Sequence, residues 1–251
     1  PMVEIGELQA YCDKLLASGD FDDYCPNGLQ VEGDRPVNAL VTGVTASQAL
    51  VDAALAENAD ALLVHHGYFW KGEAPCLVGI KGRRIRSLMR AGVSLLAYHL
   101  PLDAHPEFGN NRRLGERLAI VDSRPTDQGR GMIWRGRLEP PVRGRDFARA
   151  LERALGRSPL HIAAHDRPLR TIAWCTGAAQ GFIEDAALLG VDAFLSGEIS
   201  EQTTHQAREL GLDYFAAGHH ATERYGVQAL GAHLAARFGL THRFLEMENP
   251  V

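Results

Sequence analysis

The chain alternates between short apolar runs, which predict buried strands, and longer stretches with helical spacing of apolar residues. In the first half, the predicted strands cover 39–44, 61–64 and 93–98, and the predicted helices cover 5–16, 48–57 and 81–90. A further strand and helix are expected at 132–138 and 146–155. Strands and helices alternate in this way in folds with a parallel sheet. The pattern therefore predicts an α/β protein.

The apolar run at 61–64 ends at His65 and His66, which Gly67 follows. In parallel α/β sheets, ligands bind beyond the carboxyl ends of the strands, so polar side chains at this point are expected to face a crevice. Neighbouring strand residues point to opposite faces, so the two imidazoles converge only if the strand ends there, with Gly67 giving the turn its backbone freedom. Taken alone, the pair fits two ordinary loop histidines equally well.

The same pattern returns twice. The run at 93–98 leads to His99 and Asp103, and a short apolar run at 213–216 leads to His219 and Glu223. The last two residues are four apart at the expected start of a helix, a spacing that places both side chains on one face. A carboxylate in a first helical turn is also stabilised by the helix dipole, an explanation that needs no metal.

The second half of the sequence resembles the first. TASQ at 45–48 corresponds to TGAAQ at 176–180, and DALLVHH at 60–66 corresponds to DAFLSGE at 192–198. We therefore expect two related α/β halves, 1–123 and 124–251, that form one inseparable unit and whose strand ends face a shared metal-binding crevice. The polar stretch at 123–130 is the expected boundary.

Composition and charge argue against some partners and locations. A net charge of -5, from 26 basic and 31 acidic residues that are interspersed, makes nucleic acid an unfavourable partner. The apolar runs are too short to span a membrane and residues 1–4 lack the features of a signal sequence, so a cytoplasmic location is expected. The four cysteines have no C-x-x-C spacing and are expected to be reduced thiols.

Five residues at strand ends form a candidate set of metal ligands: His65, His66, Asp103, His219 and Glu223. Three imidazoles and two carboxylates suit zinc, iron or manganese better than calcium or magnesium. A catalytic zinc ion typically uses three protein ligands, so five favour two divalent transition-metal ions. The reaction class that such a site indicates is hydrolysis of a small-molecule substrate.

Four stretches carry a resemblance to a known family. They are DDYCPNGLQ at 22–30, VHHG at 64–67, LD at 102–103 with GNN at 109–111, and GHHATE at 218–223. In these motifs the chain resembles, nearly end to end, the short bacterial GTP cyclohydrolase 1 type 2 homologues, also called Ngg-interacting-factor-three-like proteins. The resemblance implies a dinuclear metal site at the same five residues and a toroidal homohexamer. It also implies that the protein opens GTP by hydrolysis, although the sequence has no phosphate-binding glycine motif.

Four further interpretations remain open from the sequence. His99 is a candidate for proton transfer, and a structural histidine is the alternative. Tyr68, Phe69 and Trp70 could stack a planar base, although such a cluster more often belongs to the core or a subunit interface. The acidic loop at 22–30 is expected to be mainly solvated. A non-enzymatic metal-binding protein with an interaction or regulatory role is the alternative to a hydrolase.

Overall fold

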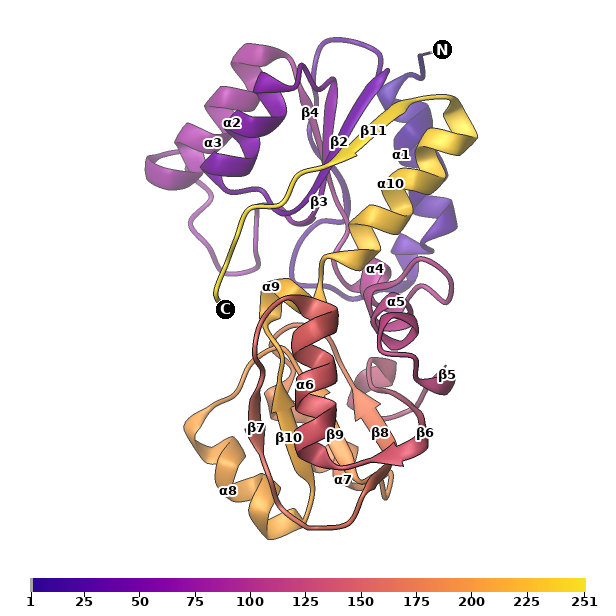
Figure 1. Cartoon of the computed structure of the whole chain (residues 1–251). Coiled ribbons are helices and arrows are strands. Elements are labelled where there is room, and N and C mark those ends of the chain that lie inside the picture. Colours follow the sequence, from indigo (N-terminus) through magenta and orange to yellow (C-terminus); the bar gives the residue numbers. More distant parts are fainter. Residues whose placement is uncertain (1) are drawn as a thin grey trace. The chain divides into compact units, whose positions relative to one another are not determined.

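The computed structural model describes residues 2–251, and its contacts divide the chain into two compact units. Unit 1 contains the residues up to Leu102 together with Gly226–Glu248. Unit 2 contains Asp103–Tyr225 together with Asn249–Val251. Each unit is built around its own mixed β-sheet (Figure 1). The α/β prediction is confirmed.

In unit 1, five strands pair in the order β1-β4-β3-β2-β11. Strands β2, β3, β4 and β11 are parallel, and β1 joins the edge antiparallel to β4. The bounds of the elements are α1 Ile5–Leu15, η1 Ser18–Asp20, β1 Gly28–Val31, β2 Ala39–Thr45, α2 Gln48–Ala56, β3 Ala61–His66, α3 Gly79–Ala91, β4 Ser94–Ala97, α4 Leu100–Ala104, α10 Tyr225–Phe238 and β11 Thr241–Phe244. Helices α4 and α10 each cross a boundary between the units.

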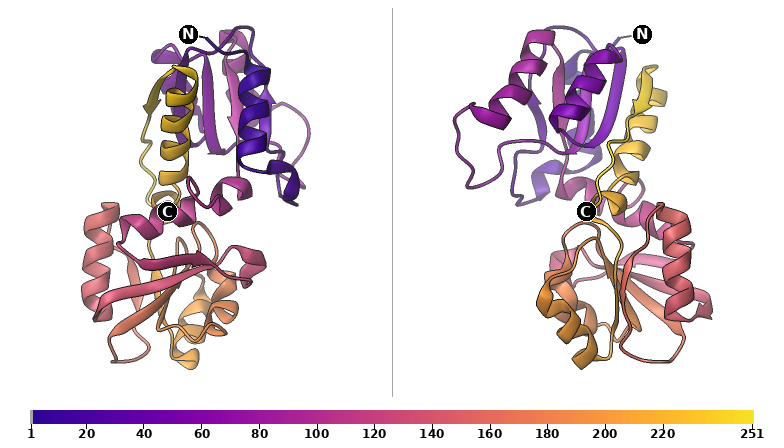
Figure 2. Two further views of the ribbon diagram at one scale, coloured as in Figure 1. Left: turned by 90° about the vertical axis from the view of Figure 1, so that its right-hand side faces the viewer. Right: turned by 60° about the vertical axis from the view of Figure 1, so that its left-hand side comes forward.

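Helices cover both faces of the unit 1 sheet. Leu8 of α1 and Leu230 of α10 belong to one buried cluster with strand residues such as Leu63. Leu50 of α2 and Leu88 of α3 belong to a second cluster. Figure 2 shows α1 and α10 on one face of the sheet and α2 and α3 on the other. A strand buried on both faces needs a continuous apolar run, which explains the sequence of β3.

In unit 2, six strands pair in the order β5-β6-β8-β9-β10-β7. Strands β8, β9 and β10 are parallel, and β6 and β7 flank them in antiparallel orientation. The bounds of the elements are α5 Asn110–Arg117, β5 Val121–Pro125, η2 Gly129–Gly131, β6 Trp134–Val142, α6 Gly144–Leu155, β7 Leu160–Ile162, β8 Leu169–Trp174, η3 Gln180–Phe182, α7 Ile183–Ala187, β9 Ala193–Ser196, α8 Glu201–Leu210, β10 Asp213–Ala216 and α9 His219–Thr222.

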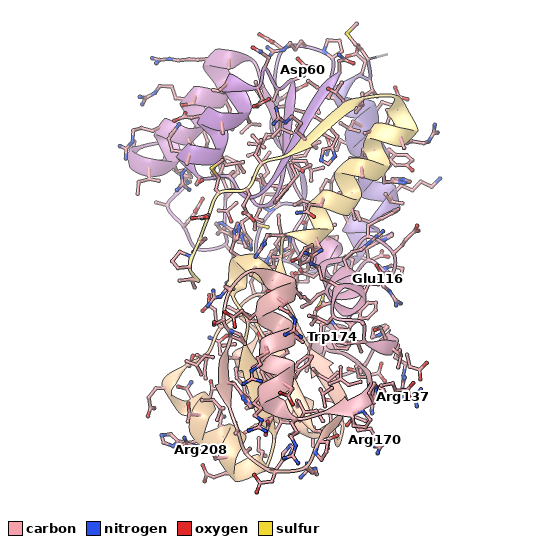
Figure 3. All side chains as sticks on the ribbon, in the orientation of Figure 1. Asp60, Glu116, Arg137, Arg170, Trp174 and Arg208 are labelled. Atoms are coloured by element: carbon pink, nitrogen blue, oxygen red, sulfur yellow. The ribbon has the colours of Figure 1, made fainter. Side chains whose placement is uncertain are left out.

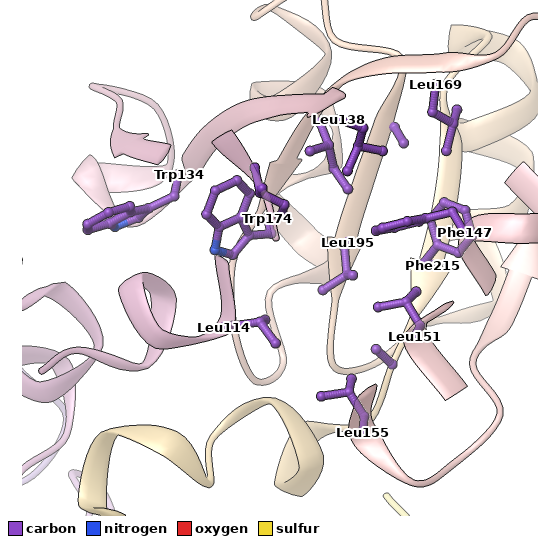
Figure 4. Packing of buried hydrophobic residues seen from close by; sticks show 14 of the residues in the cluster. Leu114, Trp134, Leu138, Phe147, Leu151, Leu155, Leu169, Trp174, Leu195 and Phe215 are labelled. Carbon is purple, nitrogen blue, oxygen red and sulfur yellow. The ribbon is translucent and has the colours of Figure 1, made fainter. Parts of the chain in front are cut away.

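The core of unit 2 also has two sides. Phe147 and Leu151 of α6 pack with Trp174 and Phe215 of the sheet (Figure 4). On the other side, Ile183 of α7 packs in a separate cluster with residues of α8 and β9. Both units are therefore three-layer arrangements with helices on each face of a central sheet.

The internal resemblance in the sequence corresponds to a shared architecture. Three parallel strands, β2, β3 and β4, correspond to β8, β9 and β10, and an antiparallel edge strand follows in each unit, β1 or β7. In both units an aspartate accepts hydrogen bonds from the start of the first parallel strand, β2 in unit 1 and β8 in unit 2. Asp60 accepts hydrogen bonds from the backbone N–H groups of Asn38 and Ala39, and from Arg35.

Asp192 occupies the matching place in unit 2. Its carboxylate accepts hydrogen bonds from the backbone N–H groups of Arg170 and Thr171, and from the Arg167 guanidinium (Figure 3 labels Asp60 and Arg170). Burial raises the pKa of both aspartates, but these hydrogen bonds outweigh it and leave both pKa values below the usual range. Two related halves were predicted, and the equivalent contacts agree with that prediction.

The boundaries of the units differ from the expected division at 123/124. The contacts divide the chain at 102/103, 225/226 and 248/249, because the last helix and strand return to the first sheet. Strand β11 pairs in parallel with β2, and Val227 and Leu234 of α10 are fully buried in the unit 1 core. The spacing of apolar residues could not show that α10 and β11 join the sheet and core of unit 1.

Helix α2 starts at the residue that the sequence predicts. Thr45 is the last residue of β2. The helix is capped by Ser47, whose hydroxyl accepts from the backbone N–H of Leu50. The expected helix is present, with its first residue at Gln48.

Candidate functional site

The two adjacent histidines are the last residues of β3 in unit 1. The ring of His65 is fully buried and its Nδ1 donates to the carbonyl oxygen of Tyr98 at 2.8 Å. The Nδ1 of His66 pairs with the hydroxyl of Thr45, also at 2.8 Å. The ring centroids are 4.7 Å apart, with the planes 45° from each other. The imidazoles therefore lie together although the strand continues through both residues, whereas the sequence predicted that it would stop first.

Gly67 has a different role from the one expected of it. Its φ is not positive, so it supplies no left-handed turn. Instead a Cβ at this position would lie 2.2 Å from Oε1 of Gln30 and 2.7 Å from Cβ of Ala97. Gln30 accepts a hydrogen bond from the backbone N–H of Tyr68 and donates to the carbonyl of the same residue. The absence of a side chain at Gly67 thus lets the 22–30 segment close against the end of β3.

His99 lies directly beside the histidine pair. Its ring centroid is 5.1 Å from that of His65 and 5.9 Å from that of His66. One nitrogen of each ring can be chosen so that all three lie within 4.8 Å of one another. The structure of unit 1 therefore gathers three imidazoles, of which the sequence had assigned only two to a metal.

Asp23 holds His99 in place. Its side chain is only 2% exposed, and its Oδ1 accepts from Nδ1 of His99 at 2.7 Å. Its Oδ2 accepts from the Asn27 side chain and from the backbone N–H of Leu100. Burial raises the pKa of Asp23, but these hydrogen bonds, led by the one from His99, outweigh it and lower the pKa to about 2. The expectation of a solvated carboxylate was wrong for Asp23, because its partner lies 76 residues away in sequence.

Cys25 lies in the same segment as Asp23. Burial, together with the negative charge of Asp23, raises the pKa of its thiol to about 12. A thiolate is the form of cysteine that acts as a nucleophile or metal ligand. The surroundings of Cys25 therefore keep it protonated and unreactive at neutral pH.

Unit 2 contains two carboxylates of the candidate set, Asp103 in α4 and Glu223 after α9. Asp103 and Glu223 are buried, 7% and 3% exposed, and one oxygen of each lies within 4.8 Å of the other. Asp103 accepts from the Asn110 side chain at 2.9 Å and from the Thr176 hydroxyl at 3.2 Å. The loop that contains Gly177 fits closely around Glu223, because a Cβ on Gly177 would lie 2.3 Å from its Oε1.

His219 lies between two carboxylates of unit 2. Its Nδ1 donates to Oε1 of Glu198 at 2.7 Å, and its Nε2 is 3.1 Å from Oε2 of Glu223. Burial lowers the pKa of His219, but the hydrogen bonds and charges of Glu223 and Glu198 outweigh it and raise the pKa to about 9. The pairing of His219 with Glu223 agrees with their spacing in the sequence.

The helix around Glu223 differs from the expected one. His219–Thr222 form the short helix α9, Glu223 follows its last residue, and α10 is a separate helix that starts at Tyr225. Glu223 therefore does not occupy the first turn of a continuous helix, and the dipole of such a helix does not explain its position. Its contact with Nε2 of His219 offers a better explanation.

Sequence reasoning missed Asp23 and Glu198 as site residues. Each accepts a hydrogen bond from Nδ1 of a histidine, His99 or His219. For Glu198 a signal existed, since the alignment of the two halves places it opposite His66. For Asp23 the signal was weaker, because a loop rich in turn-forming residues is normally solvated.

The three aromatic residues after the histidines do not act together. Tyr68 is 4% exposed and its hydroxyl donates to the carbonyl of Ala46, so it belongs to the core. Phe69 lies beneath the ammonium group of Lys81. Only Trp70 lies beside the imidazoles, with its centroid 5.0 Å from that of His99. Between residues 2 and 251, no helix has the length and hydrophobicity that a membrane span requires.

Comparison with known proteins identifies the family. The model of the Duf34/NIF3 (NGG1p interacting factor 3) family matches residues 3–250. The chain belongs to this family. A relative from Allochromatium vinosum is 62% identical over 249 residues, covering 99% of this chain and 98% of its own, and one from Pseudomonas aeruginosa is 54% identical, covering 99% of both. Both relatives are called GTP cyclohydrolase 1 type 2 homolog.

Several solved structures have the same fold. Protein ybgI, described as of unknown function, is 46% identical, with a TM-score of 0.95 over 99% of this chain and 100% of its own. A protein from Thermus thermophilus is 37% identical, with a TM-score of 0.89 over the same shares. HcgD from Methanocaldococcus jannaschii, at 21% identity and a TM-score of 0.85, shares the fold over 98% of this chain and 99% of its own.

Proposed function

We propose that this Duf34/NIF3 protein is a hydrolase that depends on two divalent transition-metal ions and acts on a small-molecule substrate. His65, His66, Asp103, His219 and Glu223 would bind the ions, with zinc, iron and manganese as the candidates. The relatives' name makes GTP the first substrate to test.

One observation carries the proposal. Each candidate histidine ligand uses Nδ1 for a hydrogen bond within its own unit, to the Tyr98 carbonyl, the Thr45 hydroxyl or the Glu198 carboxylate. Metal-binding histidines are typically oriented by such a bond from the ring nitrogen that does not bind the metal. In addition, Asp103 is fixed by Asn110 and Thr176, as a bound carboxylate usually is. The donors and their supports thus fit a metal centre.

When bound, such ions lower the pKa of a coordinated water and polarise the bond under attack. In the protein itself, His99 is the residue suited to move a proton. The Asp23 carboxylate accepts from its Nδ1, which orients the ring and leaves Nε2 for the substrate. The charge of Asp23 also stabilises the imidazolium that forms when Nε2 takes up a proton. His99 can then return this proton to the leaving group.

Metal analysis tests the proposal most directly. Protein purified without chelator or affinity tag is expected to contain about two transition-metal ions per chain. Asp103→Ala should lose most of that metal, whereas Asp146→Ala, at an exposed site on α6, should retain it. Little metal in the wild type, even after loading with zinc, iron and manganese, would contradict the proposal.

Turnover separates a hydrolase from a metal-binding protein of another kind. Metal-loaded protein is assayed with GTP, phosphoesters and cyclic amides, and activity should disappear with a chelator and return with the metal. If chelation lowers the melting temperature but no substrate is hydrolysed, the metal is structural and an interaction or regulatory role is favoured.

We also propose that the chain assembles into a homohexamer, as the resemblance implies. Several apolar side chains near α3 are well exposed in unit 1, including Val78 at 69% and Ile80 at 62%. Self-association would bury such side chains. Sedimentation velocity of the wild type tests this: a hexamer is the expected species, and a stable monomer at micromolar concentration would contradict it.

A further inference from the structure

Two aromatic side chains of unit 1 border His99. The ring of Trp70 meets the imidazole at a centroid distance of 5.0 Å and an angle of 87°. The ring of Tyr24 lies 6.3 Å from the same imidazole at an angle of 67°. Trp70 also lies 6.1 Å from His66. One residue comes from the segment before β1 and the other from the segment after β3, so two separate loops place aromatic rings at the histidine cluster.

Both rings are accessible, in contrast to the other aromatic residues nearby. Tyr24 is 50% exposed and Trp70 is partly exposed, whereas Tyr68 is only 4% exposed. The contacts of Trp70 with His66 and His99 are tilted or edge-on, and neither is a parallel stack. Large aromatic side chains are usually buried. Accessible rings beside the imidazoles of His66 and His99 therefore indicate a binding role.

The loops that carry these rings are joined by hydrogen bonds. The backbone N–H of Lys71 donates to the carbonyl of Tyr24 at 2.6 Å. In the second loop, the backbone N–H of Glu73 donates to the carbonyl of Trp70, and the Glu73 carboxylate accepts from the N–H of Phe69. Ordering the loops before binding reduces the entropy lost when a ligand binds. The aromatic rings are therefore held beside His99 in advance.

We propose that Tyr24 and Trp70 form a stacking subsite that selects substrates with a planar nitrogen heterocycle. A flat heterocycle stacks on indole and phenol rings, and a ring N–H group can donate to Nε2 of His99, whose Nδ1 already donates to Asp23. The inference deepens the proposed function, since it names the substrate class for the same histidine cluster. It does not depend on metal or turnover, because the binding of the heterocycle can be measured by itself.

Intrinsic fluorescence provides a direct readout of this subsite. The chain has three tryptophans, and Trp134 and Trp174 are 1% and 0% exposed. A ligand that stacks at the subsite therefore quenches Trp70 selectively. Guanosine is the probe, and ribose, which lacks the heterocycle, is its control. Guanosine should quench in a saturable manner in both metal-loaded and chelator-treated protein, and ribose should not.

Variants identify the residues, with binding measured by equilibrium dialysis of guanosine. Trp70→Leu and Tyr24→Leu should each weaken binding by roughly 2- to 10-fold, the usual contribution of one aromatic pair. Tyr24→Phe should bind like the wild type because it keeps the ring. Phe69→Leu is the matched control, since Phe69 contacts Lys81 and not the imidazoles.

Three outcomes would overturn the subsite: quenching by ribose equal to that by guanosine, unchanged binding in both leucine variants, or dissociation of the assembly with normal binding per chain. The two proposals can fail separately. Saturable guanosine binding without hydrolysis of any substrate supports the subsite and contradicts the hydrolase. Hydrolysis that is insensitive to Trp70→Leu and Tyr24→Leu, in KM as well as kcat, supports the hydrolase and contradicts the subsite.

Discussion

The two units share a scaffold but differ in the chemistry at their strand ends. In unit 1, β3 ends in His65 and His66, whereas the corresponding strand of unit 2, β9, leads to Gly197 and Glu198. Contacts at the opposite ends of the strands agree closely, since Asp60 and Asp192 bind the same kinds of partner. Fold-specifying residues are thus equivalent in the two units, while the site residues are different.

This contrast predicts which substitutions affect function and which affect stability. Changes at the strand ends should alter metal content or turnover and leave folding nearly intact. Changes at Asp60 or Asp192 should lower stability and leave the chemistry of the folded fraction unaltered. Four measurements test this division.

The largest effect is expected from Glu223→Gln in unit 2. This change removes the charge that faces Nε2 of His219 but keeps the shape of the side chain. Turnover should fall by at least about 100-fold, the upper end for residues that merely support a metal ligand. Glu201→Gln, at an exposed position of α8, is the control. Circular dichroism should be unchanged in both variants, and normal turnover in Glu223→Gln would contradict its assignment.

His99→Asn tests the corresponding place in unit 1. If His99 moves a proton, kcat should fall by about 100-fold while metal content stays near that of the wild type. His205→Asn, on the exposed face of α8, should change neither quantity. One ring nitrogen of His99 lies within 4.8 Å of a nitrogen of His65 and of His66, so these three could share an ion. A loss of metal in His99→Asn would therefore identify His99 as a ligand.

Asp60→Ala and Asp192→Ala should destabilise the protein by similar amounts. Each removes hydrogen bonds from two backbone N–H groups and one arginine to a carboxylate that is less than a fifth exposed. We expect each substitution to lower the free energy of unfolding by about 2 kcal/mol, from the usual strength of hydrogen bonds to charged groups. Urea denaturation measures both values. A loss of stability in only one variant would show that the hydrogen bonds of Asp60 and Asp192 are not equivalent.

The smallest expected effect is in the acid dependence of stability. The pKa values of Asp60 and Asp192 are lowered by their hydrogen bonds, which outweigh burial. Their stabilisation is therefore complete above the unfolded-state pKa, about 4, and is lost as the pH falls through the lower folded-state pKa. Unfolding midpoints between pH 5 and 2 should fall less steeply for Asp60→Asn and Asp192→Asn than for the wild type. Equal slopes would contradict this assignment.

The sequence predicted those features of the fold that depend on local pattern. Strand β3 has a continuous apolar run, and α3 ends at Gly92, whose left-handed conformation glycine adopts readily. The return of β11 to the edge of β2 was not predicted, because it joins residues about 200 positions apart and no local pattern encodes such a pairing.

The candidate site was predictable to a similar extent. His65 and His219 were found because each follows an apolar strand, and the sequence shows where strands end. Asp23 was missed because its burial depends on His99 and Leu100, which are distant in sequence. The break between α9 and α10 at Glu223 also escaped prediction, since apolar spacing continues across it. Local patterns thus locate candidate ligands but not the residues that orient them.

The return of the chain to unit 1 has a consequence for biosynthesis. A ribosome releases Asp103–Tyr225, which forms nearly all of unit 2, before the helix and strand that complete unit 1. Until α10 emerges, the α1 face of the first sheet lacks Val227, Leu230 and Leu234 and exposes its apolar surface. Unit 2 can therefore fold before α10 and β11 complete unit 1. In that interval the exposed apolar surface of unit 1 needs protection from aggregation.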